Sequence, residues 1–396
     1  MKKQIETEVL IAGGSASGFC AAIQAARSGV QVILVEETPW LGGMLTSAGV
    51  SAIDGNHRLP SGLWGEFRQH LYDFYGGPKA VETGWVSNTQ FEPHIGDEII
   101  QWMVEKEDNI DVIHGFRITD ALIDGSHVLG AIFENDEGKN LEIRAKISID
   151  ATEYGDLLAL AGCEYNIGRE SQRETGEEDA PDVPDAIIQD ITYVAILKNY
   201  GLSADKTIAK PPNYDPENYQ CTCKELCNDP DFKVADCKTM LNYGRLPNNK
   251  FMINWPINGN DFYLNVTELD HKERKKALQD AKNFTLGWIY HIQTKADQKN
   301  LGLADDEFPT PDLLPFIPYI RESRRLKGVV SLTVNDIIDP YNAKTKNIYQ
   351  TGIAVGDYPL DHHHFKAPKP VVEDYPKIPA FNVPYGCLVP KVMNGL

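Results

Sequence analysis

Residues 8–18, Glu-Val-Leu-Ile-Ala-Gly-Gly-Ser-Ala-Ser-Gly, decide the fold because an apolar run passes directly into a glycine-rich turn. The run at residues 8–12 predicts a short buried strand, and residues 13–18 predict a tight turn into a helix. One face of that helix is apolar at the i, i+3, i+4 and i+7 spacing, through Phe19, Ala22, Ile23 and Ala26. The pattern therefore predicts a strand followed by a helix that packs on a sheet.

A second apolar run follows this helix closely. Ser28 and Gly29 end the helix, and residues 30–35 form another apolar segment that finishes at Glu36. A strand–helix–strand unit with an acid after its second strand is typical of a dinucleotide site. The alternative is a glycine-rich connection in an unrelated parallel sheet, for which Glu36 would be a coincidence.

Each part of the predicted site has a physical task. Gly13 permits the tight turn, the small Ser15 still lets backbone approach a pyrophosphate, and Gly18 allows close helix packing. The helix N-terminus offers free N–H groups to phosphates, and Glu36 can accept hydrogen bonds from ribose hydroxyls. The predicted contacts are Gly13, Ser15, Ala16, Ser17, Gly18 and Glu36.

The segment after the acid favours FAD over NAD. Gly42 and Gly43, followed by Met44, provide a second place where backbone can approach a cofactor closely. Nicotinamide dehydrogenases seldom need a second approach there, whereas flavoproteins often use one. An ordinary type II turn is the alternative.

The composition is that of a soluble globular protein whose partner is a small molecule. The 396 residues carry a formal charge of -19, which disfavours nucleic acid and anionic membranes as partners because both attract basic surfaces. No run approaches 18 apolar residues and no apolar leader precedes the first strand, so we expect a cytoplasmic protein without a membrane segment.

Four of the seven cysteines lie close together, at Cys221, Cys223, Cys227 and Cys237. Their spacing matches neither paired zinc motifs nor ferredoxin motifs. We expect reduced structural cysteines in an inserted loop and no metal site, with a zinc or iron–sulfur site as the less favoured alternative.

Several segments together resemble the FAD-dependent oxidoreductase family, in the bacterial branch whose flavin domain is similar to that of fumarate reductase and succinate dehydrogenase flavoproteins. They extend over nearly the whole chain and comprise residues 12–18 with Glu36, 41–45, 149–156, 254–256, 318–325 and 356–361. Some members are labelled putative xanthan lyase, so the resemblance implies the cofactor, FAD, better than the reaction.

The segment at residues 149–156 ends a predicted strand and starts a helix. The resemblance implies that Asp150, Ala151 and Thr152 lie near the pyrophosphate, with Asp156 nearby. The same residues also suit an ordinary helix cap, because Asp and Thr are favoured there for local reasons. Turn residues near positions 124–125 and 135–138 predict a small antiparallel meander before this strand.

Two clusters are candidates for catalysis. If residues 321–325 were helical, Arg321 and Arg325 would share a face and could clamp an anionic substrate; a solvated basic face is the alternative. In the extended run at residues 361–364, Asp361 and His363 share a side. The resemblance aligns an Asp-x-His pattern with these two residues and favours His363 as the acid/base. A metal pair of His362 and His364 is less favoured, since no third ligand is evident.

The fold class expected is α/β, with a Rossmann-like FAD-binding domain, a parallel sheet with an antiparallel meander, and an α+β substrate domain. The FAD domain would span residues 1–165 with an insertion at about 45–95, and the substrate or cap domain would span residues 166–385. Residues 386–396 would be a truncated return to the FAD domain, whose last strand and helix are expected to be missing. An exposed sheet edge there would be a route to a homo-oligomer.

The function expected is hydride transfer between flavin N5 and a small polar substrate, anionic or carbohydrate-derived. Two alternatives stay open: a polysaccharide lyase or hydrolase of the xanthan type, and a non-catalytic fragment with an incomplete flavin site.

Overall fold

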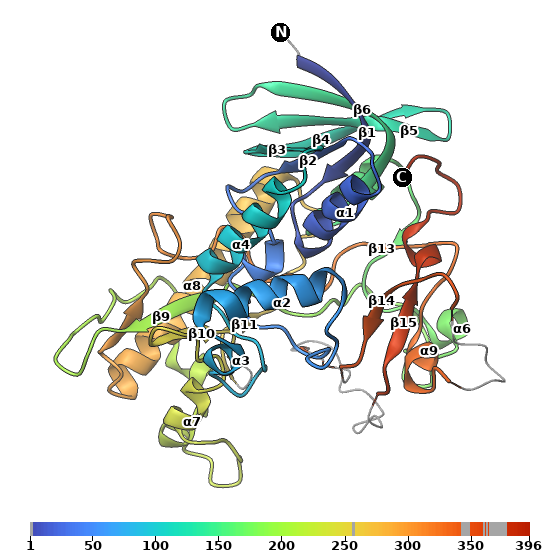
Figure 1. The fold of residues 1–396 in the computed structure, drawn as a ribbon. Helices are drawn as coiled ribbons and strands as arrows, with labels where there is room; N and C mark the ends of the chain where they lie inside the picture. The colour runs from blue at the N-terminus through green and yellow to red at the C-terminus, as the bar shows by residue number, and fades with distance from the viewer. Residues whose placement is uncertain (1–2, 256–257, 342–348, 359–360, 362, 364–377) are drawn as a thin grey trace. The chain divides into compact units, whose positions relative to one another are not determined.

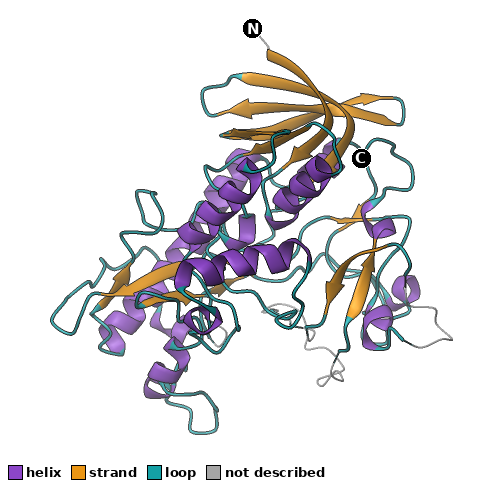
Figure 2. Cartoon of the chain, viewed as in Figure 1, coloured by secondary structure: helices purple, strands orange, loops and turns teal. Residues whose placement is uncertain are grey.

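The computed structural model describes residues 3–255, 258–341, 349–358, 361, 363 and 378–396. The chain divides into two compact units. Unit 1 contains residues 1–41, 102–189 and 322–396, and unit 2 contains residues 42–101 and 190–321. Figure 1 labels their helices and strands, and Figure 2 colours the same view by secondary structure.

Unit 1 is built on a six-stranded sheet with the order β3-β2-β1-β6-β5-β4. Its strands are β1 (Lys3–Ala12), β2 (Val32–Glu36), β3 (Ile110–His114), β4 (Phe116–Asp124), β5 (His127–Asn135) and β6 (Asn140–Asp150). The β1/β2, β2/β3 and β1/β6 pairs are parallel, while β4, β5 and β6 pair antiparallel. The parallel sheet and the antiparallel meander predicted from the sequence are both confirmed.

Helix α1 (Ala16–Arg27) connects β1 to β2 and packs on them. Its buried side chains include the four predicted ones, Phe19, Ala22, Ile23 and Ala26, and its C-cap is Ser28. The sheet core beside it contains Leu10, Ile33 and Val35, all nearly inaccessible to solvent. The amphipathic pattern thus places α1 against the sheet and its N-terminus at the carboxyl end of β1.

The remaining elements of unit 1 are short. They are α5 (Asp156–Leu160), β7 (Tyr165–Asn166), α6 (Gln172–Thr175), β13 (Arg325–Leu326), α9 (Val334–Ile338), β14 (Gly352–Gly356), β15 (Phe381–Pro384) and η4 (Tyr385–Leu388). Further along the chain, Asn394 hydrogen-bonds Ser126 and Val128, and the Gly395 carbonyl accepts from Ser148 N. Residues 394–395 therefore contact β5 and β6 of the sheet.

Unit 2 is dominated by helices and small antiparallel sheets. The helices are η1 (Gly43–Leu45), α2 (Gly62–Tyr75), α3 (Pro78–Val81), α4 (Pro93–Glu105), whose last turn crosses the unit boundary, η2 (Pro216–Tyr219), η3 (Lys224–Leu226), α7 (Cys237–Leu241) and α8 (His271–Lys295). The strands are β8 (Ile191–Thr192), β9 (Ala195–Asn199), β10 (Lys250–Ile253), β11 (Asp261–Phe262) and β12 (Leu301–Leu303). Strands β10, β9 and β12 form one sheet, and its core includes Trp255 and Trp288. Among the described residues, no helix is both long and apolar enough to cross a membrane.

Candidate functional site

The turn between β1 and α1 has no room for a side chain at Gly13 or Gly18. Gly13 adopts φ +100°, and a Cβ on it would lie 2.3 Å from the carbonyl oxygen of Ala151. A Cβ on Gly18 would lie 2.1 Å from the carbonyl oxygen of Gly13. Both glycines are therefore required by the geometry.

The N-terminus of α1 follows this turn. Ser15 is the N-cap, and its Oγ accepts a hydrogen bond from Gly18 N at 3.3 Å. The Oγ atoms of Ser15 and Ser17 lie 3.0 Å apart. The first N–H groups of a helix, here beginning at Ala16, have no partner within the helix and carry the positive end of its dipole.

Glu36 at the end of β2 is held against the same turn. Its Oε2 accepts from Gly14 N at 2.6 Å, and its Oε1 accepts from Thr38 N at 2.8 Å. Burial raises the pKa of Glu36, against the opposing effect of these two hydrogen bonds. The acid predicted to contact a ribose thus has a fixed position next to the glycine turn.

Asp150, Ala151 and Thr152 lie beside this turn as well. Ala151 N donates to the carbonyl of Ala12 at 2.8 Å, next to Gly13. Asp150 accepts from Thr152 N and Oγ1 at 3.0 and 2.7 Å and from Leu158 N at 2.7 Å. Burial raises the pKa of Asp150. Its carboxylate oxygens accept the hydrogen bonds of a local helix cap, which was the alternative interpretation of this segment.

Asp156, the fourth residue predicted near this turn, begins α5. Its N–H donates to Thr152 Oγ1 at 2.7 Å, and its carboxylate is paired with Arg324 at 2.8 Å. Asp156 is therefore linked to the turn through Thr152.

Three segments that are far apart in the sequence therefore meet in unit 1: the glycine turn of residues 13–18, Glu36, and residues 150–152. A glycine turn, a helix N-terminus and an acid are the features that a dinucleotide pyrophosphate and its ribose require. The residues of unit 1 fit the adenosine and pyrophosphate part of FAD.

The second glycine segment, predicted at Gly42, Gly43 and Met44, lies in unit 2. Gly42 and Gly43 have φ of +104° and +51°, and the chain turns into the 3-10 helix η1. A Cβ on Gly42 would lie 2.7 Å from Ile100 Cδ1 and 2.8 Å from Thr46 Oγ1. Gly42 thus allows this segment to pack closely against α4.

Asp361 and His363 lie together as predicted for neighbours on one side of an extended chain. His363 Nε2 is 3.4 Å from Asp361 Oδ2, and its backbone N–H donates to Gln189 Oε1 at 3.3 Å. Asp361 is 62% exposed and His363 is 17% exposed. The alternative pair of His362 and His364 lies outside the described residues.

The helix expected at residues 321–325 is wrong. Residues 322–324 are irregular and Arg325 begins the short strand β13, which pairs with β7. Arg321 binds Asp261 and Arg325 binds Glu170, both far away in the sequence, so tertiary contacts rather than local spacing set the conformation of this segment. Arg321 and Arg325 therefore do not share a helix face.

Each arginine is bound within its own unit. In unit 2, Arg321 donates to Asp261 Oδ1 at 3.1 Å, to Thr192 Oγ1 at 2.9 Å and to Asn254 Oδ1 at 3.1 Å. In unit 1, Arg325 is paired with Glu322 and, at 2.8 Å, with Glu170. Since residues 321–325, all of them described, form no helix, the alternative of a solvated basic helix face is wrong as well.

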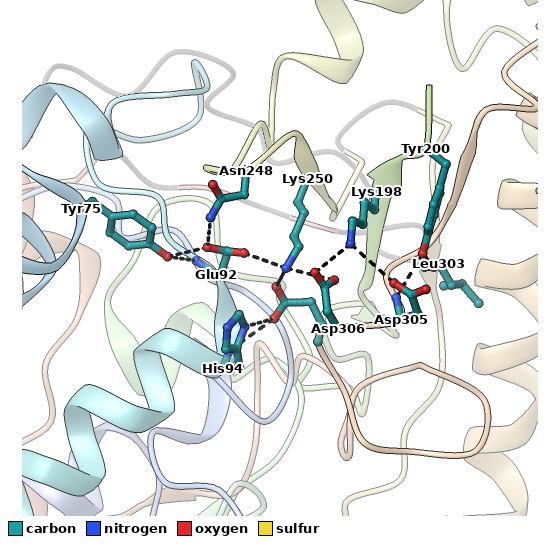
Figure 3. A network of polar contacts seen from close by, with 11 residues as sticks. Tyr75, Glu92, His94, Lys198, Tyr200, Asn248, Lys250, Leu303, Asp305 and Asp306 are labelled. Carbon is teal, nitrogen blue, oxygen red and sulfur yellow. Dashed lines mark hydrogen bonds and ion pairs between the residues drawn. The ribbon is translucent and has the colours of Figure 1, made fainter. Parts of the chain in front are cut away.

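Sequence reasoning missed a buried charge network in unit 2 (Figure 3). Lys250 Nζ lies 2.6 Å from Glu92 Oε1, 2.6 Å from Glu307 Oε1 and 3.1 Å from Asp306 Oδ1. The side chains of Lys250, Glu92 and Glu307 are 2%, 4% and 0% exposed. His94 Nδ1 lies 2.8 Å from Glu307 Oε2. A lysine directly before the apolar residues 251–253 was the signal that could have revealed the network.

The expectation of reduced cysteines is also wrong, because the four neighbouring cysteines form two disulfides. Cys221 pairs with Cys227 and Cys223 pairs with Cys237. Local folding brings the second pair together, since Lys224 N donates to the Ala235 carbonyl and Cys237 N donates to Glu225. The thiolates that a zinc or iron–sulfur site would need are therefore not available in this group.

A family model described as FAD dependent oxidoreductase matches residues 8–396. No curated protein matches the chain. The match covers almost the entire sequence, including the glycine turn, Glu36, residues 150–152 and the segment at Asp361.

Several solved structures match parts of the chain at low sequence identity. L-proline dehydrogenase from P. horikoshii is 17% identical, with 43% of this chain and 26% of that chain covered and a TM-score of 0.26. The myxobacterial chondrochloren halogenase CndH is 18% identical, with 50% and 46% covered and a TM-score of 0.33. Quinol fumarate reductase FrdA of E. coli is 17% identical, with 38% and 33% covered and a TM-score of 0.27. The chain spans less than half the length of each, and likeness at this level carries no inference about its reaction.

Proposed function

Because the chain belongs to the FAD dependent oxidoreductase family, we propose that it transfers a hydride between FAD and a small polar substrate, anionic or carbohydrate-derived. The observation that carries this proposal is the convergence of residues 13–18, Glu36 and residues 150–152 in unit 1. Family membership gives the cofactor and a general flavin redox role. What we propose beyond family membership is the class of the substrate.

The residues of unit 1 that would hold FAD are those of the turn after β1 and the N-terminus of α1, which would bind the pyrophosphate, and Glu36, which would accept hydrogen bonds from the ribose. A second close approach by the backbone of Gly42, Gly43 and Met44, which lie in unit 2, stays a prediction from the sequence. Bound there, FAD supplies a two-electron acceptor, and the side chains of the chain bind substrate and move protons.

The catalytic residues predicted from the sequence stay predictions. His363 is the predicted acid/base, and its neighbour Asp361 supports an imidazole that can hold a proton. Arg321 and Arg325 are the predicted anion-binding groups. Their present ion pairs with Asp261, Glu170 and Glu322 favour structural roles, and substitution of each arginine tests this distinction.

The experiment that tests the proposal begins with the visible spectrum of the purified protein. We expect the absorption of oxidised flavin, release of FAD on denaturation, and bleaching when a monosaccharide or 2-hydroxy acid is added without oxygen. An artificial electron acceptor should then be reduced catalytically. A colourless protein that cannot be reconstituted with FAD would contradict the proposal and favour the lyase, hydrolase or non-catalytic alternatives.

The cellular compartment is a separate question. The cytoplasmic location expected from the sequence stays a prediction, whereas two disulfides are typical of proteins that fold in an oxidising compartment. Fractionation of the producing cell, with thiol labelling of the protein before lysis, distinguishes the two. Protection of the four cysteines from labelling in an extracytoplasmic fraction would contradict the cytoplasmic prediction.

A further inference from the structure

Arg324 is a nearly buried cation of unit 1. Its side chain is 9% exposed, and its guanidinium lies over the ring of Tyr165, with Cζ 5.5 Å from the ring centroid. A guanidinium keeps its charge in proteins, and burying a charge is costly unless it is paired and hydrogen-bonded. The partners of Arg324 therefore show which part of the fold its charge supports.

Those partners are residues 154–156, at the start of α5. Arg324 Nη1 donates to the carbonyl of Tyr154 at 3.0 Å and to Asp156 Oδ1 at 2.8 Å. The backbone of Gly155 between them has φ +66°, and a Cβ there would lie 3.2 Å from Arg324 Cβ. Arg324 thus packs on this short segment and hydrogen-bonds both of its ends.

The same segment is joined to the glycine turn through Thr152. Asp156 N donates to Thr152 Oγ1 at 2.7 Å. Thr152 N lies 2.6 Å from the position that a Cβ on Gly13 would occupy. A continuous chain of contacts therefore runs within unit 1 from Arg324 through Asp156 and Thr152 to Gly13.

The charge of Asp156 also bears on this turn. Residues 13–18 contain no lysine or arginine, whereas a pyrophosphate is an anion. Burial and, to a smaller extent, the charge of Asp156 raise the pKa of Asp150, so this charge acts at the turn. Without a cation beside it, Asp156 would oppose an anion bound near residues 150–152. Arg324 offsets that charge, and the pair is only 9% and 24% exposed, so water screens it less than a surface pair.

We propose that Arg324 is a positioning residue for the pyrophosphate of FAD. It holds residues 154–156 against Thr152 and offsets the charge of Asp156, and it acts through these residues rather than by touching the cofactor. The inference rests on the proposed function, which places the pyrophosphate at the turn after β1. It deepens that function by assigning a role to a residue far away in the sequence from the turn.

The first test separates the pyrophosphate from the rest of the cofactor. The affinities of the full chain, freed of FAD, are measured for FAD by quenching of flavin fluorescence, and for ADP and adenosine by competition with FAD. We expect Arg324→Met to weaken FAD and ADP about 10-fold or more, the range expected for a lost hydrogen bond to a charged group. The affinity for adenosine, which has no pyrophosphate, should stay unchanged.

Two further variants frame this result. Glu36→Gln should weaken adenosine as well as ADP, because Glu36 is proposed to bind the ribose. Arg169→Met is the matched control, since Arg169 is another partly buried arginine of unit 1, and its Nε donates to Asp185 Oδ1 at 3.2 Å, outside residues 150–156. It should bind all three ligands as the wild type does.

A second test isolates the charge. Asp156→Asn in the Arg324→Met background removes the carboxylate that has lost its cation, so we expect part of the ADP affinity to return. Arg324→Lys keeps a positive charge but has fewer hydrogen-bond donors, and its ADP affinity should lie between those of the wild type and Arg324→Met. Circular dichroism of each variant checks that it is folded.

Two results would overturn the inference. One is a folded Arg324→Met variant that binds ADP as tightly as the wild type does. The other is an equal loss of ADP and adenosine affinity in that variant, which would mean a general loss of structure rather than a role at the pyrophosphate. A folded wild-type chain that binds neither FAD nor ADP is a different outcome, because it contradicts the proposed function itself and the inference with it.

Discussion

The glycine turn of residues 13–18 and the charge network around Lys250 both depend on close approach, but in opposite ways. In the turn, Gly13 and Gly18 lack side chains, and other backbone atoms lie within the distance that a Cβ would occupy. In the network, long side chains bring the buried charges of Glu92, Lys250 and Glu307 from three distant segments to within 2.6 Å. The turn occupies one short stretch of sequence and the network joins three distant stretches, so they should respond to different substitutions.

The largest effect should come from a methyl group in the turn. Gly13→Ala would place Cβ against the Ala151 carbonyl and require φ +100°, a region that costs about 1–3 kcal/mol for a residue with a side chain. We expect FAD to be absent from the purified variant, as measured by its visible spectrum. Gly29→Ala is the matched control because Gly29 has φ +88° but nothing within 4 Å of the added Cβ. Gly29→Ala should lose stability and keep FAD. Equal FAD content in the two variants would be evidence that the glycine turn of residues 13–18 does not bind FAD.

The network should respond to loss of its ammonium group. Lys250→Met leaves Glu92 and Glu307 buried without their common cation, and breaking a buried pair in this way costs about 3–5 kcal/mol. Urea unfolding should detect a loss of this size. The partly exposed Lys198 provides the control, and Lys198→Met should cost about 1 kcal/mol or less. Similar losses of unfolding free energy in the two variants would mean that burial does not make the ion pairs of Lys250 more important for stability than those of Lys198.

The disulfides test how far the stability of unit 2 depends on covalent links within one segment. Replacing Cys223 and Cys237 together by serine should lower the free energy of unfolding by about 3 kcal/mol, since the pair closes a loop of sequence separation 14. The pair of Cys221 and Cys227, with separation 6, should cost about 2 kcal/mol. Mass mapping of peptides without reduction checks the connectivity. Recovery of all four cysteines as free thiols from protein purified without reductant would show that the pairs do not form.

The smallest effect concerns pH. Burial lowers the pKa of His291 to about 4, and its Nδ1 lies 2.8 Å from the Tyr214 hydroxyl. The unfolded chain then binds a proton below about pH 6.5 while the folded chain does not, so stability falls as the pH drops from 6.5 towards 4. The loss is about 2 kcal/mol at pH 5. Urea unfolding of His291→Gln, compared with wild type at pH 7 and pH 5, should show a smaller pH dependence; identical dependence would contradict this account.

The sequence was sufficient for the strand, the helix and the acid around the turn because their signals are local. Four apolar residues at helical spacing, the residues that end the helix and an acid after the next strand follow directly from chain order. The same local logic predicted β6, α5 and the meander. The sequence pattern did not distinguish whether Asp150 caps a helix or lies at a cofactor site, because both roles use the same residues.

The network and the arginine segment could not be predicted in this way. Lys250 is separated from Glu92 by 158 residues and from Glu307 by 57, so no sequence period joins them. The run containing Asp305, Asp306 and Glu307 is acidic and is typical of a solvated surface. The helix expected for residues 321–325 failed because Arg321 and Arg325 bind partners far away in sequence, which override a local spacing argument.

Equilibrium titration of the purified wild-type protein with FAD tests whether the glycine turn of residues 13–18 binds the cofactor. Bound FAD is removed first by mild denaturation and refolding, and rebinding is followed by quenching of flavin fluorescence, with Gly13→Ala alongside. We expect one FAD per chain for the wild type and no saturable binding for Gly13→Ala. A folded wild-type protein that binds no FAD, or a Gly13→Ala variant that binds it equally well, would show that the turn is not the FAD site.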